Sequence, residues 1–263
     1  MWQIIFAAII YIITSLAGNS WAQTAISSEI APTDKLRVAM NAQTTVLLMR
    51  TPEGKVIGGV GLDLGKFIAE KLGISFELVP YANANAYTQS FGKGEWDIGL
   101  GPPTPLVAEK ADFIVDVLLT DYMFVAGPGR EFADAAQVDR PGVKIGVGTN
   151  SASDQFLSRT LKSARLVRTS GAGGGNIEAL RSGQVDVWAT NASNVQELAD
   201  RLPGAKLVPG RFNSEPIMMI LPKGVSSATH AGLVEIVKEA KRSGIVSKAI
   251  ERLGVKGVRA APE

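Results

Sequence analysis

The sequence predicts an α/β fold of two lobes, each a mostly parallel β-sheet flanked by helices, with two extended strands crossing between the lobes. Apolar periodicity alternates between strand and helix in the first half of the chain, and the same order recurs in the second half. A short echo supports the repeat, because residues 94–98 (GEWDI) and 183–187 (GQVDV) match in pattern and each follows a predicted helix. The 263 residues are enough for two such lobes.

The first half is predicted to run strand, helix, strand, helix, strand. Leu36, Val38 and Met40 alternate with polar or small residues, as in a strand with one face buried. The following helix has apolar residues at helical spacing, and Gly73 is placed to end it. The five elements are expected at residues 36–40, 64–72, 74–79, 85–91 and 96–101.

The second half repeats this order, with elements expected at residues 143–148, 153–162, 164–169, 176–183 and 184–190. Apolar extended segments at residues 121–127 and 216–224 are predicted to cross between the lobes, and two helical stretches then return to the first lobe. The predicted boundaries place residues 35–122 and 217–263 in lobe 1 and residues 123–216 in lobe 2.

The N-terminus has the features of an export signal. The first 28 residues carry no charged side chain, and the apolar run from Ile4 ends near Ala17, which is shorter than the ~20 residues that a membrane-spanning helix needs. Ser20-Trp21-Ala22 supplies small residues before a cleavage point at Gln23. We therefore expect residues 1–22 to be a signal peptide, with an uncleaved anchor as the alternative. Residues 23–34 are mostly polar and predict a flexible leader, and the mature protein is expected to be periplasmic.

Composition excludes several classes of function. The 27 basic and 25 acidic residues give a net charge of +2 without a dense basic cluster, which argues against a nucleic-acid partner. The chain has no cysteine, so disulfides, thiolate chemistry and cysteine-bound zinc are excluded. Its one histidine, His230, belongs to the predicted C-terminal helices, away from the strand ends. We expect no metal, no cofactor and no enzymatic activity.

Five segments together resemble the type II periplasmic binding proteins, in particular bacterial solute-binding protein family 3, whose members bind polar amino acids for ABC importers. They are GVGLDLGKFIAEKLG (59–73), GKGEWDIGLG (92–101), KADF (110–113), VKIGVGTNSASDQFL (143–157) and LRSGQVDVWATN (180–191). The resemblance implies a monomer that binds a small solute between its lobes, at the carboxyl ends of the parallel strands, and delivers it to an inner-membrane permease.

The resemblance also makes the stiff turn after residue 100 one wall of the ligand pocket, with Pro103 and Thr104 as candidate contacts. Family members that bind amino acids usually carry a carboxylate-binding arginine three residues after the threonine of this turn, and Val107 stands there. They usually carry an ammonium-binding aspartate at the end of the last lobe-2 strand, and Asn191 stands there. Both differences predict a ligand other than an ordinary α-amino acid.

Six further candidates follow strands or begin helices of the predicted lobes. They are Asn41, Thr44 and Thr45 after the first strand, Asn150 and Ser151 before a lobe-2 helix, and Asn194 near Asn191. A polar loop or helix capping would explain the same residues without a ligand. The glycine-rich stretch 171–176 lacks the lysine of a phosphate loop, and we interpret it as a surface connection.

Three other functions stay open at this point: an amino-acid-binding protein with its cation at another position, a ligand-loaded partner of a membrane sensor, and a dehydratase-like enzyme on the same fold.

Overall fold

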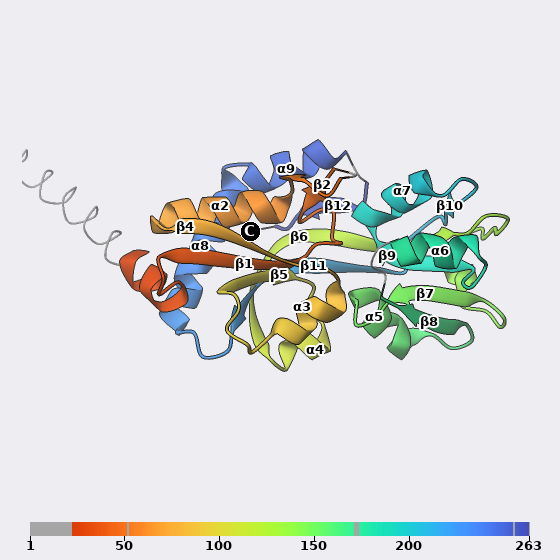
Figure 1. The fold of residues 1–263 in the computed structure, drawn as a ribbon, viewed down its shortest axis with the longest axis horizontal. Coiled ribbons are helices and arrows are strands. Elements are labelled where there is room, and N and C mark those ends of the chain that lie inside the picture. Colours follow the sequence, from red (N-terminus) through yellow and green to blue (C-terminus); the bar gives the residue numbers. More distant parts are fainter. Residues whose placement is uncertain (1–22, 52, 171–173, 255, 263) are drawn as a thin grey trace, which may run out of the picture.

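A single mixed β-sheet runs through the whole protein in the computed structural model, which describes residues 23–51, 53–170, 174–254 and 256–262. Along its main path the sheet has the strand order β4-β1-β5-β11-β6-β9-β7-β8, shown edge to edge in Figure 1. These strands are β4 (Ser75–Tyr81), β1 (Lys35–Asn41), β5 (Ile98–Gly101), β11 (Asn213–Pro222), β6 (Ala111–Ala126), β9 (Val187–Asn191), β7 (Lys144–Gly148) and β8 (Arg165–Thr169). The predicted α/β class is confirmed.

Lobe 1 is built on the parallel strands β4, β1 and β5. Helix α2 (Val60–Leu72) buries Leu64, Ile68 and Leu72 in the main core, and Gly73 ends it in the left-handed conformation at φ 68°. Helices α8 (Ser227–Arg242) and α9 (Ile245–Leu253) pack on the same core. The short helices α3 (Ala84–Ser90) and α4 (Pro105–Ala108) lie on the other face (Figure 1).

Lobe 2 repeats this plan with the parallel strands β9, β7 and β8, and β6 runs antiparallel beside β9. Helices α5 (Ala152–Thr160), α6 (Gly175–Arg181) and α7 (Ala192–Arg201) cover the sheet. A 3₁₀ turn (Ala135–Val138) and the short strand β10 (Lys206–Leu207) complete the lobe. Its buried apolar residues form two clusters, one on each face of the sheet.

Two long antiparallel strands, β6 and β11, belong to both lobes. They pair from Tyr122↔Asn213 to Ala111↔Pro222, so the boundaries predicted near residues 122 and 216 fall inside these strands. The C-terminal strand β12 (Val258–Ala260) pairs with β6 at Leu118, Leu119 and Thr120. A separate hairpin of β2 (Met49–Arg50) and β3 (Val56–Gly58) extends from lobe 1.

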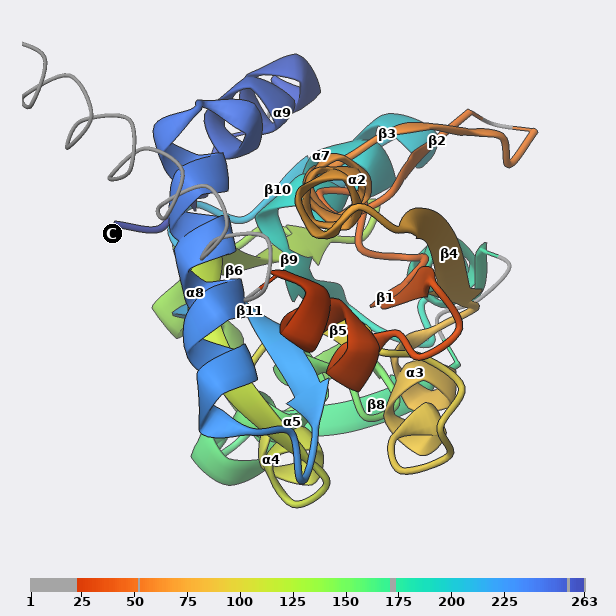
Figure 2. The same cartoon turned by 90° about the vertical axis from the view of Figure 1, so that its left-hand side faces the viewer.

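The segment expected to be a flexible leader is instead part of the folded lobe. Residues 23–30 form a helix, and Ile26, Ile30 and Ala31 are buried in the main core. The helix lies beside α8, as Figure 2 shows. The prediction of flexibility over residues 23–34 was wrong because two isoleucines four residues apart share one helix face, which buries enough apolar surface to dock a short helix.

Polar contacts fix the same helix at the start of α8. The carboxylate of Glu29 accepts hydrogen bonds from the Ser226 backbone N–H (2.6 Å), the Ser226 hydroxyl (2.7 Å) and the Thr229 hydroxyl. These bonds hold the pKa of Glu29 below its ordinary value. The predicted signal peptide, residues 1–22, lies outside the described residues. No helix in the described ranges is both long and apolar enough to cross a membrane.

Candidate functional site

A cavity of about 700 Å³ lies between the two lobes, where the strands β1, β5, β7 and β9 end. Nine of the ten residues predicted for the site line it: Asn41, Thr44, Thr45, Thr104, Val107, Asn150, Ser151, Asn191 and Asn194. Pro103 is the exception, because the turn contributes Pro102 and Thr104 to the wall instead. The structure therefore brings the predicted residues together, and their contact with a ligand stays a prediction.

The turn after β5 forms the wall in lobe 1. Thr104 precedes α4 as its N-cap residue, but its side chain makes no capping bond, and its buried hydroxyl oxygen has no hydrogen-bond partner among the described residues. Val107 packs in a small core with Tyr87 and is 4 % exposed. At Val107, where the resemblance implies a guanidinium in amino-acid-binding family members, this wall is therefore apolar.

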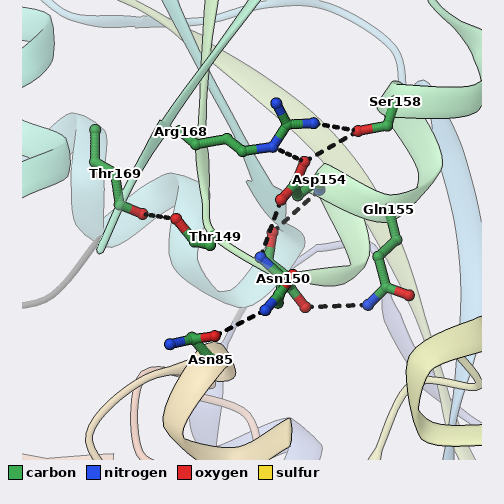
Figure 3. Close-up of polar contacts among 9 residues, drawn as sticks. Asn85, Thr149, Asn150, Asp154, Gln155, Ser158, Arg168 and Thr169 are labelled. Atoms are coloured by element: carbon green, nitrogen blue, oxygen red, sulfur yellow. Dashed lines mark hydrogen bonds and ion pairs between the residues drawn. The ribbon is translucent and has the colours of Figure 1, made fainter. Parts of the chain in front are cut away.

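The start of α5 forms the facing wall in lobe 2, and Figure 3 shows that it is occupied by the chain's own carboxylate. Asn150, in the left-handed conformation at φ 59°, donates its backbone N–H to Asp154 Oδ2 at 2.9 Å. The Asp154 backbone N–H donates in turn to Ser151 Oγ at 3.1 Å, which confirms Ser151 as the N-cap. Arg168 Nε donates to Asp154 Oδ1 at 2.9 Å. The backbone N–H groups of Asn150 and Asp154 are therefore already used within the protein, and Asp154, which is paired with Arg168, is not among the lining residues.

Asn191 and Asn194, at the start of α7, are also engaged by the chain. Asn191 Oδ1 accepts a hydrogen bond from Ser193 Oγ at 2.6 Å. Asn194 Oδ1 accepts from the Thr45 backbone N–H at 3.1 Å, and Asn194 Nδ2 donates to the Gln43 carbonyl at 2.6 Å. Sequence reasoning placed both asparagines at the cavity but did not anticipate these partners.

Charge is confined to the rim of the cavity. Among the described lining residues, the charged side chains are Arg50, Glu197 and Arg201, and all three are exposed. Arg201 Nη1 forms an ion pair with Glu197 Oε1 at 3.2 Å. The other polar lining residues carry hydroxyl or amide groups. The interior consequently suits an uncharged partner that forms hydrogen bonds.

Three aromatic residues complete the lining: Tyr87, Tyr122 and Trp188. None of the three was among the site residues predicted from the sequence. Burial raises the pKa of both phenols, so they stay protonated and can donate a hydrogen bond.

A sequence signal for the aromatic lining did exist in the glycines of two strands. A Cβ on Gly99 would lie 2.5 Å from the Tyr87 hydroxyl, and a Cβ on Gly146 would lie 2.4 Å from the Trp188 ring. Glycine inside a strand marks a place where another group approaches closely.

No cluster of metal-ligating side chains stands out in the part of the chain that the structure describes. No group of three or more histidine, cysteine, aspartate or glutamate residues there could hold a metal ion. His230 lies on α8, outside the cavity lining.

No family model matches the sequence, and no curated protein matches it either. Solved structures do match. A mutant of the Thermotoga maritima protein ArgBP has a TM-score of 0.73 at 18 % identity, covering 87 % of this chain and 98 % of that one. The substrate-binding protein AbpA of an amino acid ABC transporter from Streptococcus pneumoniae, bound to L-arginine, has a TM-score of 0.72 at 21 % identity, covering 85 % and 96 %. A solute receptor for L-cysteine from Neisseria gonorrhoeae has a TM-score of 0.73 at 18 % identity, covering 87 % and 92 %.

These likenesses define the class of fold: the chain has the two-lobed fold of the periplasmic binding proteins, as its sequence predicted. The particular proteins that it resembles in structure are amino-acid-binding proteins. An ancestral amino-acid-binding protein described as a precursor of cyclohexadienyl dehydratase has the same fold, with a TM-score of 0.72 at 20 % identity. At these identities the likeness shows the fold, and the ligand has to be argued from the cavity.

Proposed function

We propose that this chain is an extracytoplasmic solute-binding protein of an ABC importer. It would act as a periplasmic monomer that captures a small polar solute between its lobes and delivers it to an inner-membrane permease. The observation that carries the proposal is the cavity itself, which lies between two lobes joined by two strands and is lined from both sides by hydrogen-bonding groups. A solute that contacts both lobes at once would favour their closed arrangement, which a permease can recognise.

We further propose that the solute is neutral or carries a single charge, and is not an ordinary α-amino acid. A carboxylate beside Val107 would lose hydration without gaining a guanidinium partner, and at the start of α5 the backbone N–H of Asn150 is already bonded to Asp154. An ammonium group would find the amide of Asn191 in place of a carboxylate. Charge-assisted hydrogen bonds of about 1.5–3 kcal/mol each would be missing at both ends of a zwitterion.

Calorimetric titration tests this proposal. We expect weak or absent binding of the twenty common amino acids, and binding of at least one member of a panel of sugars, polyols and amides. The paired substitutions Val107→Arg and Asn191→Asp should confer amino-acid binding, whereas Val107→Leu with Asn191→Asp, which adds no cation, should not. Submicromolar affinity of the unmodified protein for any common amino acid would refute the ligand class.

A second candidate is an amino-acid-binding protein with its cation at a different position. Arg50 and Arg201 favour it, because both line the cavity. In that case Arg50→Ala or Arg201→Ala would abolish amino-acid binding in the same titration, while Val107→Leu would leave it intact. A membrane sensor could recognise the same closed lobes, and isolating the membrane protein that binds the loaded form would separate a sensor from a permease.

A further inference from the structure

Loop 43–46 of lobe 1 contacts α7 in lobe 2 through four direct hydrogen bonds, one of them from Thr45 Oγ1 to Glu197 Oε2 at 3.2 Å. The backbone N–H of Thr45 donates to Asn194 Oδ1 at 3.1 Å, and Asn194 Nδ2 donates to the Gln43 carbonyl at 2.6 Å. The backbone N–H of Val46 donates to Ser193 Oγ at 3.2 Å. We propose that Ser193 and Asn194 form a latch that stabilises the closed arrangement of the lobes whether or not a solute is bound.

The Asn194 amide is well suited to this role because it satisfies one backbone donor and one backbone acceptor of the facing loop. Oδ1 accepts from the Thr45 N–H and Nδ2 donates to the Gln43 carbonyl, as the C=O and N–H groups of a paired β-strand would do. The loop cannot follow lobe 2 passively, since Val46, Leu47 and Leu48 are buried in the core of lobe 1. Opening the lobes would therefore separate the amide from both backbone groups at once.

The Ser193 bond is shielded from water. Ser193 is 2 % exposed and Val46 is fully buried at 0 %. The Ser193 hydroxyl accepts from Val46 and donates to Asn191 Oδ1 at 2.6 Å, so its hydrogen-bonding capacity is used inside the protein. A buried backbone N–H that loses its partner is costly, which makes this bond an obstacle to opening.

A second bridge crosses between the lobes on the other side of the sheet. Asn150 Nδ2 donates to Asn85 Oδ1 at 2.7 Å, linking the turn before α5 to α3 (Figure 3). Nearby, the Leu106 backbone N–H donates to Gln155 Oε1 at 3.3 Å. Helices α3 and α5 lie below the sheet in Figure 1 and α7 lies above it, so the lobes are joined on both sides.

Asn194 is therefore a positioning residue, which acts on solute binding through lobe closure. Each latch bond joins two groups of the protein itself and can form without a solute. The latch therefore raises the fraction of solute-free molecules in the binding-competent closed form. The apparent affinity for a solute is proportional to that fraction, so loss of the latch would weaken solute binding. This last consequence rests on the proposed solute-binding function, whereas the latch itself does not.

The test measures lobe separation without any solute. The chain has no cysteine, so Lys93→Cys in lobe 1 and Ser163→Cys in lobe 2 allow two spin labels to be attached site-specifically. Both positions are exposed. Pulsed electron–electron double resonance would then give the distribution of distances between the two labels. We expect a dominant short distance in the parent, and in Asn194→Ala an approximately tenfold lower ratio of closed to open molecules, from the loss of two hydrogen bonds.

Gln196→Ala is the matched control, because Gln196 is exposed on the same helix and its amide donates within that helix, to Asp200 at 2.8 Å. It should leave the distance distribution unchanged. Asn194→Asp keeps the acceptor for Thr45 but places a carboxylate oxygen where Nδ2 donates to the Gln43 carbonyl at 2.6 Å, so it should also shift the distribution toward the open form, and it serves if the alanine variant is unstable. A parent that is mainly open, or an Asn194→Ala distribution identical to the parent, would overturn the latch. Failure of the whole solute panel would refute the proposed function without affecting this result.

Discussion

Replacing Ile30 by alanine tests whether the N-terminal helix is a structural part of lobe 1. Ile30 is 5 % exposed and belongs to the main core together with Ile26, which is 8 % exposed. Truncating a buried isoleucine to alanine costs about 2–5 kcal/mol. The site is at the edge of the core and can partly collapse, so we expect about 2–3 kcal/mol. For a chain of this size that corresponds to a decrease in Tm of roughly 4–12 °C.

The assay is thermal and urea-induced unfolding of a chain that starts at Gln23, followed by circular dichroism. Ser28→Ala is the control, because Ser28 is exposed on the same helix and its hydroxyl donates within that helix, to the Thr24 carbonyl at 2.8 Å. The control should change the free energy of unfolding by less than about 0.5 kcal/mol. If Ile30→Ala falls within the same limit, the helix is not docked in solution and residues 23–34 are flexible after all.

Two further predictions concern the cavity wall and the pH dependence of stability. Gly146→Ala would place a Cβ 2.4 Å from the Trp188 ring, so we expect a destabilisation of about 1–3 kcal/mol. In a chain that starts at Gln23 and carries Trp96→Phe, Trp188 is the remaining tryptophan, and its emission should shift; unchanged emission and Tm would contradict this. The pKa of Glu29 is lowered first by its hydrogen bond from Thr229 and then by those from Ser226. Glu29 therefore stabilises the folded state above its unfolded pKa of about 4.3, and this stabilisation is lost as pH falls through the folded pKa. Urea unfolding between pH 5 and pH 3 should therefore show a smaller loss of stability in Glu29→Gln than in the parent, and equal losses would refute the assignment.

Local periodicity was sufficient to predict the main strands of the sheet and the helices that pack on it. The alternation of Leu36, Val38 and Met40 predicted a strand, and all three are fully buried in β1. Strand ends and the family resemblance together predicted nine of the residues that line the cavity, since parallel strands place their carboxyl ends at one edge.

What the sequence did not reveal depends on contacts between distant parts of the chain. Thr45 and Asn194 are 149 residues apart, and no local pattern marks them as partners. The N-terminal helix was missed for a related reason. Ile26 and Ile30 stand among polar residues, and their burial depends on α8, where Gly232 leaves room for the Ile26 side chain.

The antiparallel pairing of β6 with β11 has a consequence for engineering. The chain enters lobe 2 beyond Tyr122 and returns at Asn213, and these two residues face each other across adjacent strands. In such a pair the Cα atoms are about 4.5–5.5 Å apart. Lobe 2 is thus inserted into lobe 1 through two neighbouring junctions, so the whole lobe could be exchanged at these two points. Grafting the corresponding segment from another protein of this fold would replace Asn150 and Asn191 together, and so would change one half of the cavity while leaving the Val107 wall untouched.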